Sequence, residues 1–177
     1  MLAALLVGLT ACEDPLVFPW DDQPDTVRLF SLARPEPNLP SGFGFHDKVR
    51  VQVEQPNATG LWDLALDTEG ASLVLKPPGA LGITTRAGIA TLGDIPFADV
   101  TEAPGDTLLY ELDGAVPVTA GTVYAIRTNR QTGSFGSTCV FYAKMQPLSI
   151  DVGGGELQFQ FVSSPVCNNR SLVSPEN

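Results

Sequence analysis

Two stretches of the chain, Lys48–Glu54 and Glu156–Phe161, alternate apolar and polar residues at every position. A period of two is typical of a β-strand with one buried and one solvated face. No segment after residue 11 keeps a helical period over three turns. The 177 residues also include 17 Gly and 15 Pro spread along the chain, which favours many turns between short elements. We therefore expect an all-β fold.

The expected strands are short and are bounded by Gly or Pro. The strand at 156–161 is expected to form a hairpin with residues 148–151 around Gly153–Gly155, and further strands are predicted at 26–32, 62–67, 72–76, 107–112, 122–128 and 138–145. Pro96–Glu102 favours a short helix, because Pro suits a first helical turn and Pro104 would end it. The pattern predicts a β-sandwich-like or barrel-like single domain of about eight or nine strands, with at most one or two short helical turns.

The amino end carries a separate signal. Residues 2–11 hold no charge and lead directly to Cys12, and this segment is about half as long as a membrane-spanning helix. Leu9-Thr10-Ala11-Cys12 resembles the bacterial lipobox at all four positions, a motif in which the cysteine is acylated and the chain is cut before it. We expect a lipoprotein signal peptide at 1–11 and a lipid anchor at Cys12, rather than a buried strand or helix. Since no Lys or Arg precedes the apolar run, we expect the true start codon to lie upstream of Met1.

Residues 12–25 are rich in Asp, Glu and Pro, a composition that suits a tether. The β domain is then expected over residues 26–177. The acidic run Asp21–Asp25 lacks the spaced acidic loop with Gly that builds a calcium site. A lipid on Cys12 would hold the domain on a membrane. We therefore expect an exported, membrane-anchored bacterial lipoprotein on the periplasmic or cell-surface face.

Cys139 and Cys167 are the two cysteines that remain when Cys12 is assigned to the lipid. Thiol pairs of exported proteins meet an oxidising environment and tend to join. We expect a disulfide between them. A reactive or metal-binding role is the alternative, but neither a CxxC motif nor a nearby His supports it.

The net charge and the small number of reactive side chains restrict the classes of function that we expect. The chain carries 10 Lys and Arg against 20 Asp and Glu, and the resulting net charge of −10 disfavours nucleic-acid binding. A single His leaves few general bases or metal ligands, and Ser41, Ser134 and Ser137 lack a GxSxG frame. We expect no enzyme activity and no metal site. A small secreted hydrolase is the alternative.

A series of motifs over about residues 60–163 resembles, in order and rough spacing, the HmuY-like family of exported, lipid-anchored haem-binding proteins. The motifs are Trp62-Asp63-Leu64-Ala65-Leu66, Gly88-Ile89-Ala90, Phe97-Ala98-Asp99-Val100, Ala103-Pro104, Val123–Thr128, Tyr142–Met145 and Leu157–Val162. The resemblance implies an all-β fold with a few short helices, together with export and a lipid anchor.

The resemblance also implies haem as a ligand, which the family holds through axial ligands such as a pair of His. The single His, His46, lies upstream of the matching motifs, so no axial ligand carries over. His46 is the one candidate for a cofactor-binding residue, because Met145, Tyr110, Tyr124 and Tyr142 are all expected to lie in the sheets. We expect no bound cofactor, and haem binding that is weak or absent.

The function that these observations favour is a lipid-anchored cell-envelope protein. It would display a non-enzymatic β-rich binding or surface module that contacts a small molecule, a glycan or a partner protein. An HmuY-like haem-binding lipoprotein is the alternative that rests on the resemblance.

Overall fold

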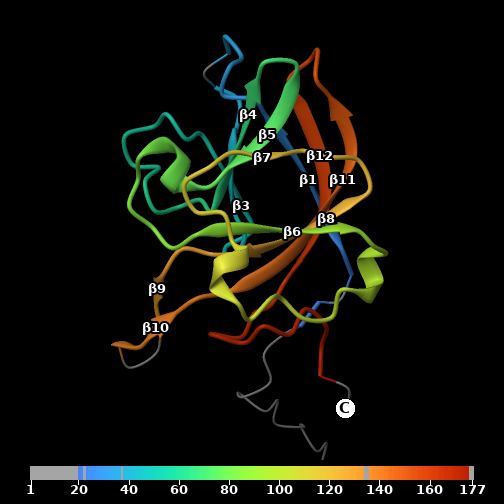
Figure 1. The fold of residues 1–177 in the computed structure, drawn as a ribbon. Helices are drawn as coiled ribbons and strands as arrows, with labels where there is room; N and C mark the ends of the chain where they lie inside the picture. Colours follow the sequence, from blue (N-terminus) through green and yellow to red (C-terminus); the bar gives the residue numbers. More distant parts are fainter. Residues whose placement is uncertain (1–19, 22, 37, 134–135, 176–177) are drawn as a thin grey trace, which may run out of the picture.

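The computed structural model describes residues 20–21, 23–36, 38–133 and 136–175, so the predicted signal peptide and Cys12 lie outside the described residues. The described part is all-β (Figure 1): twelve strands form two five-stranded antiparallel sheets and a two-stranded ribbon. Its helical segments are three single 3₁₀ turns. The predicted all-β fold is confirmed, in the sandwich-like rather than the barrel-like form. The strands outnumber the expected eight or nine because several contain only two or three residues.

The first sheet has the strand order β1-β12-β11-β8-β6. Its strands are β1 (Asp25–Phe30), β6 (Gly88–Asp94), β8 (Thr122–Arg127), β11 (Tyr142–Asp151) and β12 (Glu156–Ser163). β11 and β12 form the predicted hairpin, and β1 pairs with β12 along its whole length. Along β12 the alternating sequence buries Phe159 and Phe161 and leaves Gln158 and Gln160 partly exposed.

The second sheet has the strand order β3-β2-β4-β5-β7. Its strands are β2 (Gly42–Gly44), β3 (Val49–Val51), β4 (Leu64–Glu69), β5 (Ser72–Lys76) and β7 (Val116–Pro117). The separate ribbon pairs β9 (Gln131–Thr132) with β10 (Thr138–Cys139). β3 and β7 are therefore the two edges of the second sheet, while β1 and β6 are the edges of the first.

The main core lies between the two sheets and contains aliphatic and aromatic side chains from both. Phe43 of β2 contacts Phe159 and Phe161 of β12 edge to face, with ring centroids 5.8 and 5.0 Å apart. Phe45 joins the same group, 4.9 Å from Phe43. Each such aromatic pair contributes about 0.5–1.5 kcal/mol beyond the burial of its area. This aromatic group ties the second sheet to the first.

The outer face of the first sheet is partly covered by the segment that follows β6. This segment contains the 3₁₀ turns η2 (Phe97–Asp99) and η3 (Thr107–Leu109). The ammonium of the buried Lys144 in β11 donates to the carbonyls of Phe97 (3.0 Å) and Val100 (2.8 Å). A buried lysine donor therefore holds this segment against the sheet.

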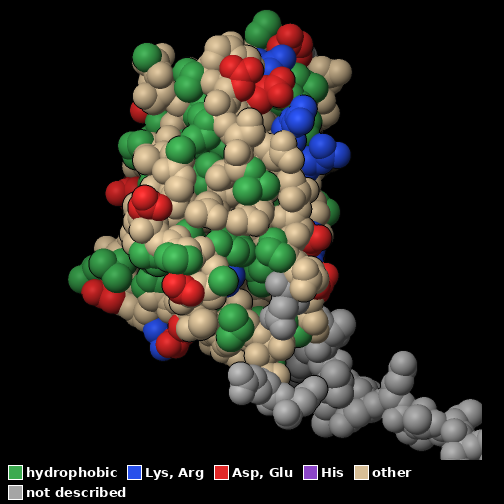
Figure 2. Space-filling model, turned by 90° about the vertical axis from the view of Figure 1, so that its right-hand side faces the viewer, with side chains coloured by type: hydrophobic (Ala, Val, Ile, Leu, Met, Phe, Trp, Pro, Cys, Tyr) green, Lys and Arg blue, Asp and Glu red, His purple; other side chains and the backbone are tan. Residues whose placement is uncertain are grey.

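Figure 2 shows the side of the molecule on which the β11–β12 hairpin lies. Charged side chains gather near the upper end of that side, and its middle carries few charges. On the outer face of the two strands, Gln160 Nε2 donates to Gln146 Oε1 (2.9 Å), and Gln146 Nε2 donates to the Gly121 carbonyl (3.0 Å). Amides thus take the solvent-facing positions that the alternating sequence leaves polar.

The short helix expected over Pro96–Glu102 is present only as the three-residue 3₁₀ turn η2, with Pro96 directly before its first residue. The strand predicted at residues 107–112 is wrong. The Asp106 side chain accepts a hydrogen bond from Leu108 N (2.9 Å), which caps η3 in place of an extended strand. Only Glu111 retains a strand-like contact, an isolated bridge to Ile89.

One predicted strand is shorter than expected, and two strands of the structure lie where none was expected. The alternation at Lys48–Glu54 yields only the three residues of β3, because a turn follows in which Gln55 N donates to Gln52 O (3.1 Å). β2 and β6 were not predicted. Both contain glycines instead of a clear alternation, and the register of β6 shifts between Thr91 and Gly93.

Gly44 of β2 allows the loop before β4 to pack closely on the second sheet. A Cβ atom on Gly44 would lie 2.4 Å from the Leu61 carbonyl oxygen, so the loop backbone would have to move. We predict that Gly44→Ala lowers the free energy of unfolding by about 1–3 kcal/mol, measured by urea denaturation. Gly153→Ala is the matched control, since its Cβ would meet only Asp151 Oδ1 at 3.6 Å. Equal stability of the two variants would contradict this close contact.

Candidate functional site

His46, the predicted cofactor-binding candidate, lies in the turn between β2 and β3. Its ring stacks on Phe141, with centroids 3.8 Å apart and planes 16° from parallel. Its Nε2 is 3.8 Å from Asp47 Oδ1, and the side chain is 36% exposed. His46 is thus held against an aromatic ring of the segment that joins β10 to β11.

Asp63 lies directly beneath this turn and connects three segments. Its Oδ2 accepts a hydrogen bond from Phe45 N (2.8 Å), and its Oδ1 accepts one from Asn129 N (2.7 Å). The side chain is buried, and this burial raises the pKa of Asp63 to about 6, although the two N–H donors act in the opposite direction. Both carboxylate oxygens are therefore engaged by the backbone, in the interior of the protein.

Thr128 continues the network from Asn129 to the ring under His46. Thr128 Oγ1 accepts from Phe141 N (2.9 Å) and donates to Asn129 O (3.0 Å), and Thr128 N donates to Phe141 O (2.9 Å). The end of β8, the start of β11 and the turn after β2 are therefore joined through polar groups.

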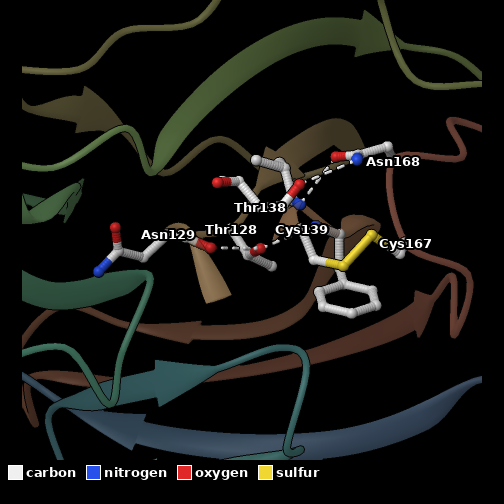
Figure 3. Close-up of a disulfide and its surroundings, with 8 residues drawn as sticks. Thr128, Asn129, Thr138, Cys139, Cys167 and Asn168 are labelled. Atoms are coloured by element: carbon white, nitrogen blue, oxygen red, sulfur yellow. Dashed lines mark hydrogen bonds between the residues drawn. A yellow bond between two sulfur atoms is a disulfide. The ribbon is translucent and has the colours of Figure 1, made fainter. Parts of the chain in front are cut away.

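The predicted disulfide between Cys139 and Cys167 is present, with a Cα–Cα distance of 5.0 Å (Figure 3). Asn168, the next residue, binds the same strand: its Oδ1 accepts from Val140 N (3.0 Å) and its Nδ2 donates to Thr138 O (3.0 Å). The disulfide and the Asn168 side chain together fix the carboxyl-terminal segment beside the His46–Phe141 pair.

The other residues considered as haem ligands lie elsewhere. Met145 and Tyr124 are buried in the core between the sheets, as expected, and the Tyr124 hydroxyl donates to Pro117 O (2.8 Å). Tyr142 belongs to β11. Tyr110 follows η3 instead of lying in a strand, and its hydroxyl donates to Pro104 O (3.0 Å). Each of these tyrosine and methionine side chains is thus buried or partly buried within the fold, and His46 alone lies at the surface.

The serine and acidic residues considered in the sequence analysis have the following positions in the structure. The candidate serine Ser41 is buried, and Ser134 lies outside the described residues. Asp25, from the acidic run, forms an ion pair with Lys48 (2.7 Å). Across the described ranges, no group of three or more His, Cys, Asp or Glu is arranged to hold a metal ion. In the same part of the chain, no helix has the length and apolar character needed to cross a membrane.

Sequence reasoning missed a shallow groove of about 650 Å³ along the edge strand β3, which we refer to as the β3 groove. Its apolar lining includes Pro40, Val49 and Leu61, and Val49 and Leu61 are both exposed. Arg50 belongs to this groove and also to a neighbouring hollow of about 370 Å³ that contains Arg28 of β1. The alternating sequence predicted a strand here, but a single strand does not reveal whether it will lie at the edge of a sheet.

Comparison with known proteins adds no relationship: no protein-family model and no curated protein matches this chain.

The disulfide closes a loop between two cysteines that are 28 residues apart in the sequence. For a loop of this length the chain-entropy relation gives a stabilisation of the folded state of about 3.5 kcal/mol. We predict that replacing both cysteines, Cys139→Ser with Cys167→Ser, lowers the free energy of unfolding by about that amount in urea denaturation. Mass spectrometry of the unreduced exported protein should show the linked peptides. Two free thiols in that protein would contradict the assignment.

Asp63 makes stability depend on pH. In the unfolded chain its carboxyl titrates near 3.8, whereas in the folded chain its pKa is about 6, so the native state keeps the proton longer. This stabilising contribution is full below about pH 4 and is lost as the pH rises through 6. At pH 4 Asp63→Asn should be less stable than wild type by about 1–3 kcal/mol, because an amide nitrogen, unlike either oxygen of the protonated carboxyl, cannot accept a hydrogen bond from an N–H donor.

The raised pKa of Asp63 and the hydrogen bond lost in Asp63→Asn together predict how the stability of the variant compares with that of wild type at each pH. The stability difference between wild type and Asp63→Asn should be largest at pH 4 and should shrink by about 2–3 kcal/mol by pH 7. Urea denaturation at several pH values measures it. A difference that does not change with pH would show that folding does not raise the pKa of Asp63.

Proposed function

We propose that this protein is a lipid-anchored cell-envelope protein that displays a non-enzymatic β-rich binding module. The observation that carries the proposal is the sequence Leu9-Thr10-Ala11-Cys12, which matches the lipobox at each position. The Cys139–Cys167 disulfide supports export, because disulfides persist in oxidising compartments.

The arrangement of the chain suits display from a membrane. Cys12 and Asp25 are separated by 13 residue-to-residue steps (25 − 12), which span at most about 45 Å when fully extended. β1 begins at the same end of the sandwich at which the described carboxyl-terminal residues lie (Figure 1), and the β4–β5 and β11–β12 hairpins lie at the opposite end. An anchor at Cys12 would leave these hairpins and the sheet edges accessible to a partner.

A binding role is supported by how the reactive side chains are used. His46 stacks on Phe141, Cys139 and Cys167 are joined, and both oxygens of Asp63 accept backbone hydrogen bonds. These groups build the fold. By contrast, the β3 groove offers accessible apolar side chains, and Arg50 of the same strand adds a guanidinium beside it, a combination that suits a recognition surface.

Labelled palmitate supplied to a bacterial host that expresses the full-length chain tests the anchor. Wild type should incorporate the label, and Cys12→Ala should lose it, because the acylated thiol is gone. The double variant Cys139→Ser with Cys167→Ser is the control and should keep the label. Equal labelling of wild type and Cys12→Ala would disprove the lipid anchor.

A further inference from the structure

The backbone of β3 has one open side. In β2 the carbonyls of Ser41 and Phe43 accept from Leu66 N (2.8 Å) and Asp63 N (2.9 Å), on the side of β4. Hydrogen bonds alternate in direction along a strand, so Gly42 and Gly44 bond toward β3, where their register partners are Val51 and Val49.

The residue between these two partners, Arg50, must then direct its N–H and C=O away from β2. Among the described residues no strand pairs with that side of β3. β3 thus presents a backbone donor and acceptor to an additional strand.

The two faces of β3 differ in their chemistry at this open edge. Side chains alternate along a strand, so the Val49 and Val51 side chains lie on one face of β3 and the Arg50 side chain lies on the other. Arg50, between the two valines, therefore borders both the β3 groove and the neighbouring hollow. Leu61 and Pro40 extend the apolar lining of the groove, and Gln55 and Asn57 add amides. On the Arg50 face, the hollow shared with Arg28 brings in a second guanidinium.

The lining of this edge carries no carboxylate, although the chain as a whole is acidic. The net charge is −10, yet the described residues that line the β3 groove and its neighbouring hollow include two Arg and no Asp or Glu. Lys48 is paired with Asp25 (2.7 Å), and Arg28 lies 3.6 Å from Glu156. Arg50 forms no ion pair with a carboxylate of the described residues. Arg50 therefore offers its guanidinium to an acidic group of another chain.

We propose that β3 binds an extended segment of a partner protein as an added strand, with an acidic residue of that segment opposite Arg50 and apolar residues on either side of it. The acidic side chain would lie on the Arg50 face. The flanking apolar side chains would lie on the face of Val49 and Val51 and enter the β3 groove. The recognised pattern is thus apolar, acidic, apolar. This inference rests on the proposed binding function and specifies its partner.

A second copy of this chain fits the edge less well. Antiparallel pairing of two β3 strands centred on Arg50 would place two guanidiniums directly opposite each other, and like charges in that position are destabilising. The charge of the edge therefore favours a different, acidic chain over self-association.

Fluorescence anisotropy with short labelled peptides tests the proposal on the full-length protein in detergent. The probe contains Val-Glu-Val between threonines, and the matched control contains Val-Lys-Val. The glutamate peptide should bind saturably and about tenfold more tightly than the lysine peptide. N-methylation of the central residue removes its N–H but keeps its side chain, and it should abolish binding if the segment pairs as a strand.

Charge exchange provides the second measurement. Arg50 is exposed, so Arg50→Glu should fold, and thermal unfolding checks this. The variant should reverse the preference, binding the lysine peptide more tightly than the glutamate peptide. Leu61→Ser should weaken both interactions without changing the preference.

The proposal is overturned if the glutamate peptide does not bind, if both peptides bind wild type equally, or if the N-methylated peptide binds as well as its parent. A dimer in sedimentation that the glutamate peptide fails to dissociate would also overturn it, since β3 would then pair with itself. None of these results affects palmitate labelling at Cys12, so failure of this inference is distinguishable from failure of the anchor.

Discussion

The packing of β2 against β12 through Phe43, Phe159 and Phe161 is the contact on which the rest of the structure depends. It holds two antiparallel sheets face to face, and each sheet alone would expose an apolar face to water. Within the second sheet, the strand order leaves β3 at an edge, and the β3 groove lies along it.

Buried polar groups connect loops and strand ends that the apolar core does not hold together. Asp63 replaces backbone pairing where the second sheet meets the end of β8, accepting from Phe45 N and Asn129 N. The same burial that makes these hydrogen bonds strong also makes the carboxylate costly to ionise, which explains its raised pKa. The motif Trp62-Asp63 therefore has a structural explanation: Trp62 packs on the outer face of the second sheet, and Asp63 joins the loops.

In this proposal the lipid anchor, the disulfide and the binding edge occupy different parts of the chain. The lipid would act at Cys12, the disulfide fixes the carboxyl-terminal segment beside Phe141, and β3 lies at the open edge of the second sheet. A partner strand at β3 would need no rearrangement of the core, because Val49 and Leu61 are already exposed. Recognition of this kind relies on backbone pairing and a few side chains, so it requires no catalytic group.

The sequence by itself determined the all-β class, the β11–β12 hairpin, the helical turn after Pro96 and the Cys139–Cys167 pair. These follow from periods, turn residues and counts that act between near neighbours or on the whole composition. It did not reveal β2, the absence of a strand at 107–112, the hydrogen bonds of Asp63 to two other segments or the edge position of β3. Asp63 meets Asn129 across 66 residues, and an edge is defined only by which strands fail to lie beside it. Such features depend on which distant segments pair and pack together, so only the tertiary structure decided them.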